Sequence, residues 1–304
     1  MEWHAPWDIR VTLDLFLGGL GIGLFLLSVL LTAYGKNRYR KLAAIGAYLA
    51  PVLVGVGVLF LLSELGRPER FLSTLYNFNI QSVTSWGGIF QVAFMVLSLI
   101  YAWLYFKNNT SGSFFRVVWG FGTIFAIFVG VYHGLLLASL GRPLWIGGMV
   151  TALFFVSSLL GGTALILLIK ELGMSWGVSQ KMAKEVASAS DGKGFNFTVL
   201  FCILTTLQLI LVLSWQVSLS RGGLETAATA NNMMDQFGGL WIGFVLLAGL
   251  IIPILGSLYS LIKDRTSEMS KGMAVVLSSL VIVGGFTFKY IVIAAGQIKF
   301  PIPF

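Results

Sequence analysis

Charged residues are scarce in this sequence. They make up 11% of the 304 residues, whereas hydrophobic residues make up 57%, and the mean hydropathy is +0.89. A soluble globular domain carries about 25% charged residues, so the composition excludes an ordinary water-soluble domain and indicates a protein surrounded by lipid. The apolar runs do not alternate and are too long for barrel strands, and they therefore predict helices.

Cysteine and histidine are also scarce. The single cysteine, Cys202, excludes a disulfide framework and a cysteine-ligated iron–sulfur cluster within this chain. The two histidines are His4 and His133, and His4 precedes the first apolar run, so a haem held by two histidines is not expected. The motif "GGLGIG" at 18–23 is no nucleotide-binding fingerprint, because no strand precedes it.

Eight apolar runs are long enough to cross a membrane, which takes about 20 residues for a ~30 Å hydrocarbon core. They lie at roughly 11–33, 43–63, 84–106, 117–139, 146–169, 195–218, 238–262 and 273–296. We therefore predict an all-α integral membrane protein with eight transmembrane helices, forming a single domain over 1–304. The opening "MEWHAPWDIR" lacks the basic region of a cleavable signal peptide, so the first run is expected to remain as a helix.

Lysine and arginine are divided unequally between the two sets of loops. Thirteen lie in 34–42, 107–116, 170–194 and 263–272, and six lie on the opposite side, namely Arg10, Arg67, Arg70, Arg142, Arg221 and Lys299. The positive-inside rule places the first set in the cytoplasm, so both termini are predicted on the outer side. Membrane topology thus accounts for the net charge of +8, and no nucleic-acid partner is needed. The segment 219–237 is predicted as an outer loop that caps the protein or docks a partner.

Several polar side chains fall within the spans or at their ends. Burying a polar or charged side chain in a membrane costs free energy, so a functional site is the default interpretation of each. They are Asp14, Glu64, Gln91, Tyr132, His133 and Lys289, together with Trp86 at the start of the third span. At 1.5 Å per residue, Asp14 lies roughly 5 Å below the outer boundary, and the others except Glu64 and Trp86 lie roughly 10 Å below it. The inner half shows mostly Ser and Thr, so we predict a site open toward the outer face.

Each of these residues has a structural alternative. Asp14 can pair with Arg10, Glu64 can pair with Arg67 alone, and His133 can donate to a carbonyl. Lys289 can neutralise Asp14 or Glu64. An outer aromatic belt is an alternative for Tyr132 and the interpretation we favour for Trp3, Trp7, Trp86, Trp145 and Trp241. The repeated Leu-Gly-Arg-Pro in "SELGRPERF" (63–71) and "SLGRPLW" (139–145) suggests related helical hairpins, or simply helix punctuation.

Carboxyl, imidazole, phenol and amine groups at one depth in the membrane suit a lipid-soluble molecule with two carbonyl or hydroxyl ends. A quinone fits, because its oxygens need hydrogen-bond donors and its reduced form releases two protons, which carboxylates or histidine can receive. Asp14, Glu64 and His133 are the candidates for proton transfer. The candidates for the quinone site or its rim are Tyr132, His133, Asp14, Trp86, Arg67, Gln91 and Lys289. The electrons would leave to a partner that docks on the outer face.

Four motifs resemble the NrfD/PsrC family of polysulfide reductase-like membrane subunits. They are "LDLFLGGLGIG" (13–23), "LGRPERF" (65–71), "SWGGIFQ" (85–91) and "YHGLLLASLGRPLW" (132–145). The resemblance implies an eight-helix subunit of a prokaryotic cytoplasmic membrane, with a quinone, expected to be menaquinone, bound near the outer face. It also implies a four-cluster iron–sulfur ferredoxin-like subunit and a molybdopterin catalytic subunit as partners. Tyr132 aligns with the family's quinone-contacting tyrosine, and Asp14 lies near its polar contacts in the first span, whereas His133 departs from the smaller residue expected there.

Three other functions stay open from the sequence. One is a proton- or ion-translocating subunit of a larger respiratory complex, which a relay between a carboxylate and Lys289 would support. Another is a secondary transporter, although such a protein typically places its site near the midplane. The last is a passive anchor for a catalytic subunit.

Overall fold

The computed structural model describes residues 7–35, 39–64, 76–175, 195–263 and 268–298, which contain helices and no strand. The elements of the first half are α1 (Ile9–Gly35), α2 (Arg40–Glu64), α4 (Val83–Phe106), α5 (Ser113–Ala138) and the short 3₁₀ helix η1 (Pro143–Trp145). Those of the second half are α6 (Gly148–Ser175), α8 (Phe197–Ser220), α9 (Leu224–Leu240), η2 (Trp241–Ile251), α10 (Ile252–Lys263) and α11 (Lys271–Gly296). Within these ranges eight helical segments are long and apolar enough to cross a membrane. This confirms the predicted all-α fold with eight spans.

The helices begin where polar residues cap them and extend as far as the apolar runs last. Ser82 accepts a hydrogen bond from the backbone N–H of Ser85 at the start of α4, and Asn196 accepts one from Val199 at the start of α8. In lipid every backbone polar group must be satisfied within the segment, so a long apolar run has no alternative to a continuous helix.

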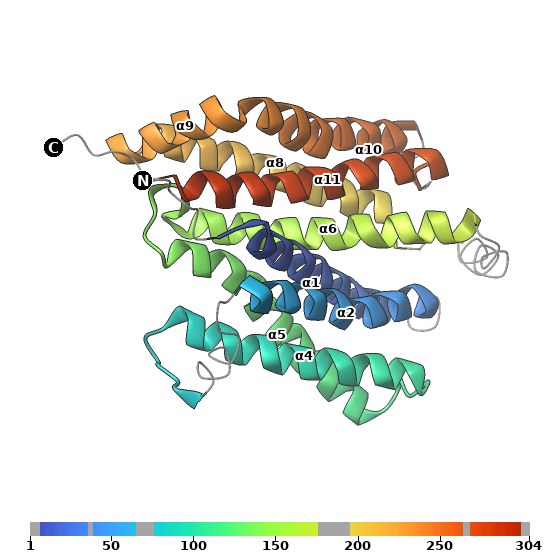
Figure 1. Cartoon of the computed structure of the whole chain (residues 1–304). Helices are drawn as coiled ribbons and strands as arrows, with labels where there is room; N and C mark the ends of the chain where they lie inside the picture. Colours follow the sequence, from blue (N-terminus) through green and yellow to red (C-terminus); the bar gives the residue numbers. More distant parts are fainter. Residues whose placement is uncertain (1–6, 36–38, 65–75, 176–194, 264–267, 299–304) are drawn as a thin grey trace.

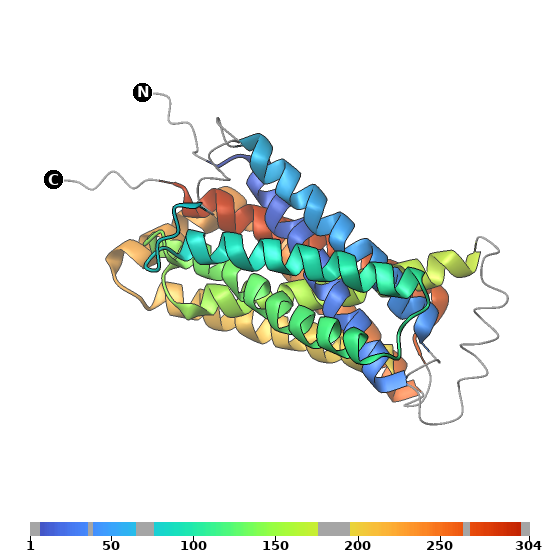
Figure 2. The same ribbon diagram turned by 90° about the horizontal axis from the view of Figure 1, so that it is seen from below.

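The described helices form two neighbouring groups (Figure 1). In the first, α1 packs most extensively against α2, and α4 packs against α5. In the second, α6 packs against α8 and α11, and the long segment formed by α9, η2 and α10 packs against α8 and α11. The view in Figure 2 shows the same bundle turned by 90°. The groups meet where α1 and α5 pack on α6, and α1 also contacts α11, so α1 lies near the centre of the bundle.

Glycines allow α1 and α6 to approach closely. A methyl group placed on Gly23 would lie 2.8 Å from the carbonyl carbon of Ser158, and one placed on Gly162 would lie 2.7 Å from the Cα of Gly23. Both distances are far below normal contact, so the two backbones touch at this crossing. Small residues are common at such crossings in membranes because they let helix backbones come together.

Both ends of the described residues lie at the same end of the bundle, here called the terminal end. The backbone N–H of Trp7 donates to Gln297 Oε1 (2.8 Å), and Gln297 Nε2 donates back to the Trp7 carbonyl (3.0 Å). Arg142, from the second Leu-Gly-Arg-Pro, donates to the carbonyls of Gly296 and Gln297. Cations near a helix C-terminus stabilise its unpaired carbonyls, so this tetrapeptide caps α11. The corresponding residues 65–68 lie outside the described residues.

The seventh span differs from its predicted extent. The sequence places it at 238–262 after an outer loop, but the helical segment covers the 40 residues Leu224–Lys263. The expected loop is largely α9, because Thr229 and Met233, four residues apart, are buried against the bundle while the opposite face carries its polar residues. The middle of the segment is the π-helix η2, and its last bond runs from the Ile252 N–H to the Leu247 carbonyl. Pro253 follows and has no N–H to donate.

Candidate functional site

Three of the predicted polar residues are buried around one stretch of α1. Asp14, His133 and Lys289 are 5%, 2% and 2% exposed, and they come from α1, α5 and α11. Lys289 Nζ hydrogen-bonds the carbonyl of Leu15, which follows Asp14 in α1, and His133, which follows Tyr132 in α5, packs on Gly18 one turn further along α1. Residues far apart in the sequence are therefore brought to one place, which we call the Asp14 cluster: Asp14, Tyr132, His133 and Lys289.

Lys289 crosses from the second helix group to the first. Its Nζ donates a hydrogen bond to the Leu15 carbonyl at 2.7 Å, and it lies 6.0 Å from the ring centre of Phe16 and 5.5 Å from that of Phe154. Aromatic faces at these distances stabilise a cation that has lost water. Gly19 makes room for the amine, because a methyl group there would lie 2.6 Å from Ser158 Oγ and even closer to Lys289 Nζ.

Glycines also position the two neighbouring residues of α5. A methyl group on Gly18 would lie 3.0 Å from His133 Cε1, so the imidazole packs directly on α1. The ring of Tyr132 packs on Gly87 of α4, where a methyl group would lie 2.5 Å from its Cδ2 and closer to Cε2 and Cζ. Gly18 and Gly87 therefore make room for the imidazole of His133 and the ring of Tyr132.

Two buried polar atoms of the cluster have no hydrogen-bond partner within the described part of the protein. They are Asp14 Oδ1, which faces Gly57 of α2, and His133 Nδ1. No ion pair within 4.0 Å joins Asp14 to Lys289 among the described residues. Leaving a buried donor or acceptor unpaired costs about 1–3 kcal/mol. Such groups are rare in folded proteins, so each one indicates a specific role or a missing partner. The cluster can therefore accept and donate hydrogen bonds to a bound molecule.

Glu64 lies in a separate ionic group at the terminal end. Arg10 Nη2 is 2.5 Å from Glu64 Oε2, in a geometry without hydrogen-bond alignment, and Arg10 Nη1 donates to the Ser63 carbonyl at 2.5 Å. Arg10 Nε also donates to Asp8 at 2.7 Å. Desolvation raises the pKa of Asp8, but the hydrogen bonds from Arg10 outweigh it and hold this pKa below its ordinary value. Arg10 thus joins the ends of α1 and α2 and does not pair with Asp14.

The remaining candidates are placed differently. Trp86 is 38% exposed, donates to the Ile80 carbonyl at 3.0 Å and contacts the rings of Phe78 and Phe90. Gln91 is buried in α4. Arg67 lies outside the described residues, as does His4, so the predicted pair between Glu64 and Arg67 stays a prediction.

One interpretation of the sequence needs correction. Trp145 and Trp241 are 1% and 0% exposed, so they are core residues and not part of an aromatic belt. The end of the bundle opposite the terminal end holds a separate set of polar contacts. There Ser28 and Thr32 bond the hydroxyl of Tyr101, and Lys170 pairs with Glu171 and Glu268. These groups lie far along α1 and α6 from the Asp14 cluster and stabilise helix contacts.

Sequence reasoning also missed Gln208 and Ser157. Both are buried and line a cavity beside Lys289. The other candidates were identified as polar side chains within an apolar span. The same rule would have identified Gln208, near the middle of the sixth span. Ser157 gave no such signal, because serines are common in membrane helices and can bond their own backbone.

Comparison with known proteins gives a consistent result. The sequence is 24% identical to the "Protein NrfD homolog" of Haemophilus influenzae, over 98% of this protein and 97% of that one. It is 25% identical to the C chain of the polysulfide reductase of Wolinella succinogenes, over 97% and 94%. It is also 22% identical to the "Hdr-like menaquinol oxidoreductase integral membrane subunit" of Archaeoglobus fulgidus, over 54% of this protein and 41% of that one.

The family described as "Polysulphide reductase, NrfD" matches residues 1–301. This match covers nearly the whole sequence, including the four motifs and every residue of the Asp14 cluster. Eight apolar helices within the described residues agree with it. The chain therefore belongs to the NrfD polysulphide reductase family, as a multi-pass integral protein of the cytoplasmic membrane.

Proposed function

We propose that this protein is the quinone-binding membrane subunit of a respiratory oxidoreductase complex, and that the Asp14 cluster is its quinone site. The observation that carries this proposal is the pair of unpartnered buried atoms, Asp14 Oδ1 and His133 Nδ1. A carboxyl and an imidazole left without partners in lipid are stabilised by a molecule that brings carbonyl or hydroxyl groups to them.

The residues of the cluster match the two forms of a quinone. The hydroxyl of Tyr132 and a protonated nitrogen of His133 can donate to a carbonyl oxygen, while the carboxylate of Asp14 can accept from a hydroxyl. Tyr132 is only partly buried, which leaves its ring at the edge of the buried cluster. The ring of Phe16 and the apolar helices around it suit the hydrocarbon parts of such a molecule.

A bound quinol would supply two electrons and two protons on oxidation. Asp14 and His133 are placed to receive protons, because both are ionisable groups with a free position. Glu64, which lies beside Arg10 at the terminal end, is our candidate for the last acceptor before solvent. The excess of Lys and Arg in the opposite loops orients the terminal end outward, so these protons would be released on the outer side.

The electrons require a partner. We propose an iron–sulfur subunit of the four-cluster ferredoxin type at the terminal end, with a molybdopterin catalytic subunit beyond it. The names of the relatives support an assembly of this kind, since one belongs to a polysulfide reductase and another is a subunit of a menaquinol oxidoreductase. Menaquinone is accordingly the quinone that we expect here.

The test uses the assembled complex in mild detergent. Tyr132→Phe removes one hydrogen-bond donor and Asp14→Asn removes the charge of the acceptor, with little change in volume. We expect each to lower quinol-linked turnover about tenfold or more, because loss of one positioned hydrogen bond to a reacting group costs about 1.5–3 kcal/mol. The content of co-purified quinone should fall in parallel, while the partner subunits remain bound.

Tyr101→Phe is the matched control. Tyr101 is a fully buried tyrosine of α4, and its hydroxyl bonds the hydroxyls of Ser28 and Thr32. Removing the Tyr101 hydroxyl should leave turnover unchanged. Wild-type turnover in a double variant Tyr132→Phe, His133→Ala would contradict the assignment of the quinone to the Asp14 cluster. Solute uptake by vesicles that contain this protein alone would favour a transporter instead.

A further inference from the structure

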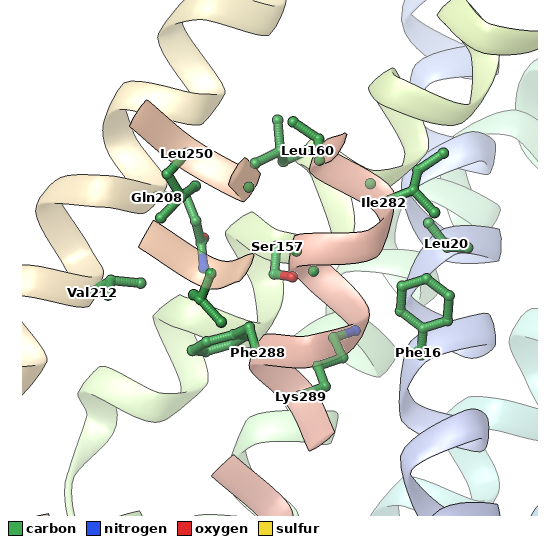
Figure 3. Close-up of a pocket in the computed structure, with 16 residues that line it drawn as sticks. Phe16, Leu20, Ser157, Leu160, Gln208, Val212, Leu250, Ile282, Phe288 and Lys289 are labelled. Carbon is green, nitrogen blue, oxygen red and sulfur yellow. The ribbon is translucent and has the colours of Figure 1, made fainter. Parts of the chain in front are cut away.

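A cavity lies beside Lys289 in the second helix group. It lies between α6, α8, η2 and α11 and is closed on one side by Phe16 and Leu20 of α1. Figure 3 shows Ser157 between Gln208 and Lys289, with the lysine extending toward Phe16. Asp14, Tyr132 and His133 do not line this cavity. We call it the Gln208 pocket.

The pocket contains an unpaired polar group. Gln208 is 4% exposed, and its Oε1 has no hydrogen-bond partner among the described residues. Ser157 is 8% exposed and brings a hydroxyl to the same space. Lys289 Nζ carries three N–H groups when charged, of which one donates to Leu15. An amide, a hydroxyl and an amine therefore belong to residues that line the same cavity.

The shape of the helices explains why the space stays open. Four of its lining residues are glycines: Gly161, Gly249, Gly284 and Gly285. Gly249 of the π-helix η2 touches Gly284 of α11, where a methyl group would lie 2.9 Å from the Gly284 Cα. This close contact holds η2 and α11 together on one side and leaves no side chain to fill the neighbouring space. π-Helical turns are rare and often occur at functional sites.

The size of the pocket decides which ligand it can take. The space open to the centre of a water molecule is about 20 Å³. One water needs roughly 10–15 Å³ by this measure, together with two to four polar partners, so the pocket suits one or two waters and is too small for a quinone ring. An apolar ligand would leave Gln208 Oε1 unpaired.

We propose that the Gln208 pocket is an internal water site in the second helix group, with Gln208, Ser157 and Lys289 as its polar partners. Water here satisfies the orphaned amide oxygen and the spare N–H groups of Lys289. The buried ammonium then has a partner on each side, with Leu15 of α1 on one and the water on the other.

The test labels buried side chains through the water that touches them. X-ray radiolysis of the detergent-solubilised complex makes hydroxyl radicals from internal water, and mass spectrometry then measures oxidation at each residue. Phe288 lines the pocket and is 2% exposed, whereas Phe94 and Phe25 are 0% exposed and pack on each other in the first helix group. Since a site of this size holds water, we expect Phe288 to be oxidised about tenfold faster than either control.

Variants of α8 identify the anchor of the water. Gln208→Leu should reduce the oxidation of Phe288 to the rate of Phe94. Thr205→Val should leave it unchanged, because the Thr205 hydroxyl bonds the Phe201 carbonyl in its own helix. Equal rates for Phe288 and Phe94 in the wild-type complex would overturn the proposal even if Gln208→Leu fails to fold. The readout needs no quinone, so this result is independent of the proposed function.

Discussion

Gly87→Ala tests the role of Tyr132 without changing Tyr132 itself. Gly87 lies near the start of α4, and the phenol ring of Tyr132 packs directly on its Cα. An added methyl group would lie 2.5 Å from Tyr132 Cδ2 and closer to Cε2 and Cζ. The substitution therefore acts on the position of the ring, while the hydroxyl and its chemistry are unchanged.

The geometry sets the size of the effect. Carbon atoms pack at about 3.5–4.0 Å, so the ring must move by at least about 1 Å or α4 must separate from α5. Overpacking of this kind costs about 1–3 kcal/mol of stability. A displacement of about 1 Å at a positioning residue can reduce a reaction about 10²-fold. We therefore expect quinol-linked turnover of Gly87→Ala to fall between about tenfold and a hundredfold, with a lower melting temperature.

The assay measures turnover of the purified complex with a soluble quinol as the substrate. Turnover is then expressed per amount of the membrane subunit in the preparation. Gly120→Ala is the matched control, because Gly120 lies in α5 and a methyl group there meets nothing within 4 Å. Gly120→Ala should retain wild-type turnover. Its stability should not fall, because alanine is more favourable than glycine in a helix by up to about 1 kcal/mol. Full turnover and an unchanged KM for Gly87→Ala would refute the placement of Tyr132 at the quinone site.

Two further predictions concern the packing that positions the site. Gly23→Ala should lower the melting temperature strongly, because its methyl group would lie 2.8 Å from the backbone carbonyl carbon of Ser158 and force α1 from α6; a melting temperature like that of Gly120→Ala would contradict this contact. Arg142→Ala should destabilise the protein by about 1–3 kcal/mol by removing charged hydrogen bonds to the last carbonyls of α11. The control is Arg221→Ala, which changes an exposed arginine at the end of α8. Thermal unfolding compares the stability of the two variants, and equal stability would contradict the capping of α11 by Arg142.

Most of the fold could be predicted because each span is encoded locally. A run of about 20 apolar residues crosses the bilayer as a helix wherever it occurs, so the number and approximate bounds of the spans follow from composition alone. The prediction was wrong at 224–237, where polar residues suggested a loop. There the buried face of α9 consists of isolated residues such as Thr229 and Met233, and only packing against the bundle shows that they face inward.

The candidate site could be predicted only as a list of residues at one depth. Asp14, Tyr132, His133 and Lys289 do come together, but Glu64 lies in a separate group with Arg10, and Trp86 faces outward. Depth follows from the rise per residue, whereas the direction in which a side chain points depends on the rotation of its helix. That rotation is set by contacts between helices that are far apart in the sequence.

The sequence by itself determined that this is a membrane protein of eight helices with polar groups confined to a few places, because lipid leaves an apolar run no other structure. The tertiary structure decided which of these groups meet. The glycine contacts of α1 with α6, His133 and Lys289 rotate three helices so that Asp14 shares a site with a histidine and a lysine more than 100 residues away. The π-helix η2 contributes Val245, Gly249 and Leu250 to the lining of the Gln208 pocket beside them. Such pairings depend on close approach between backbones, which no local pattern of residues specifies.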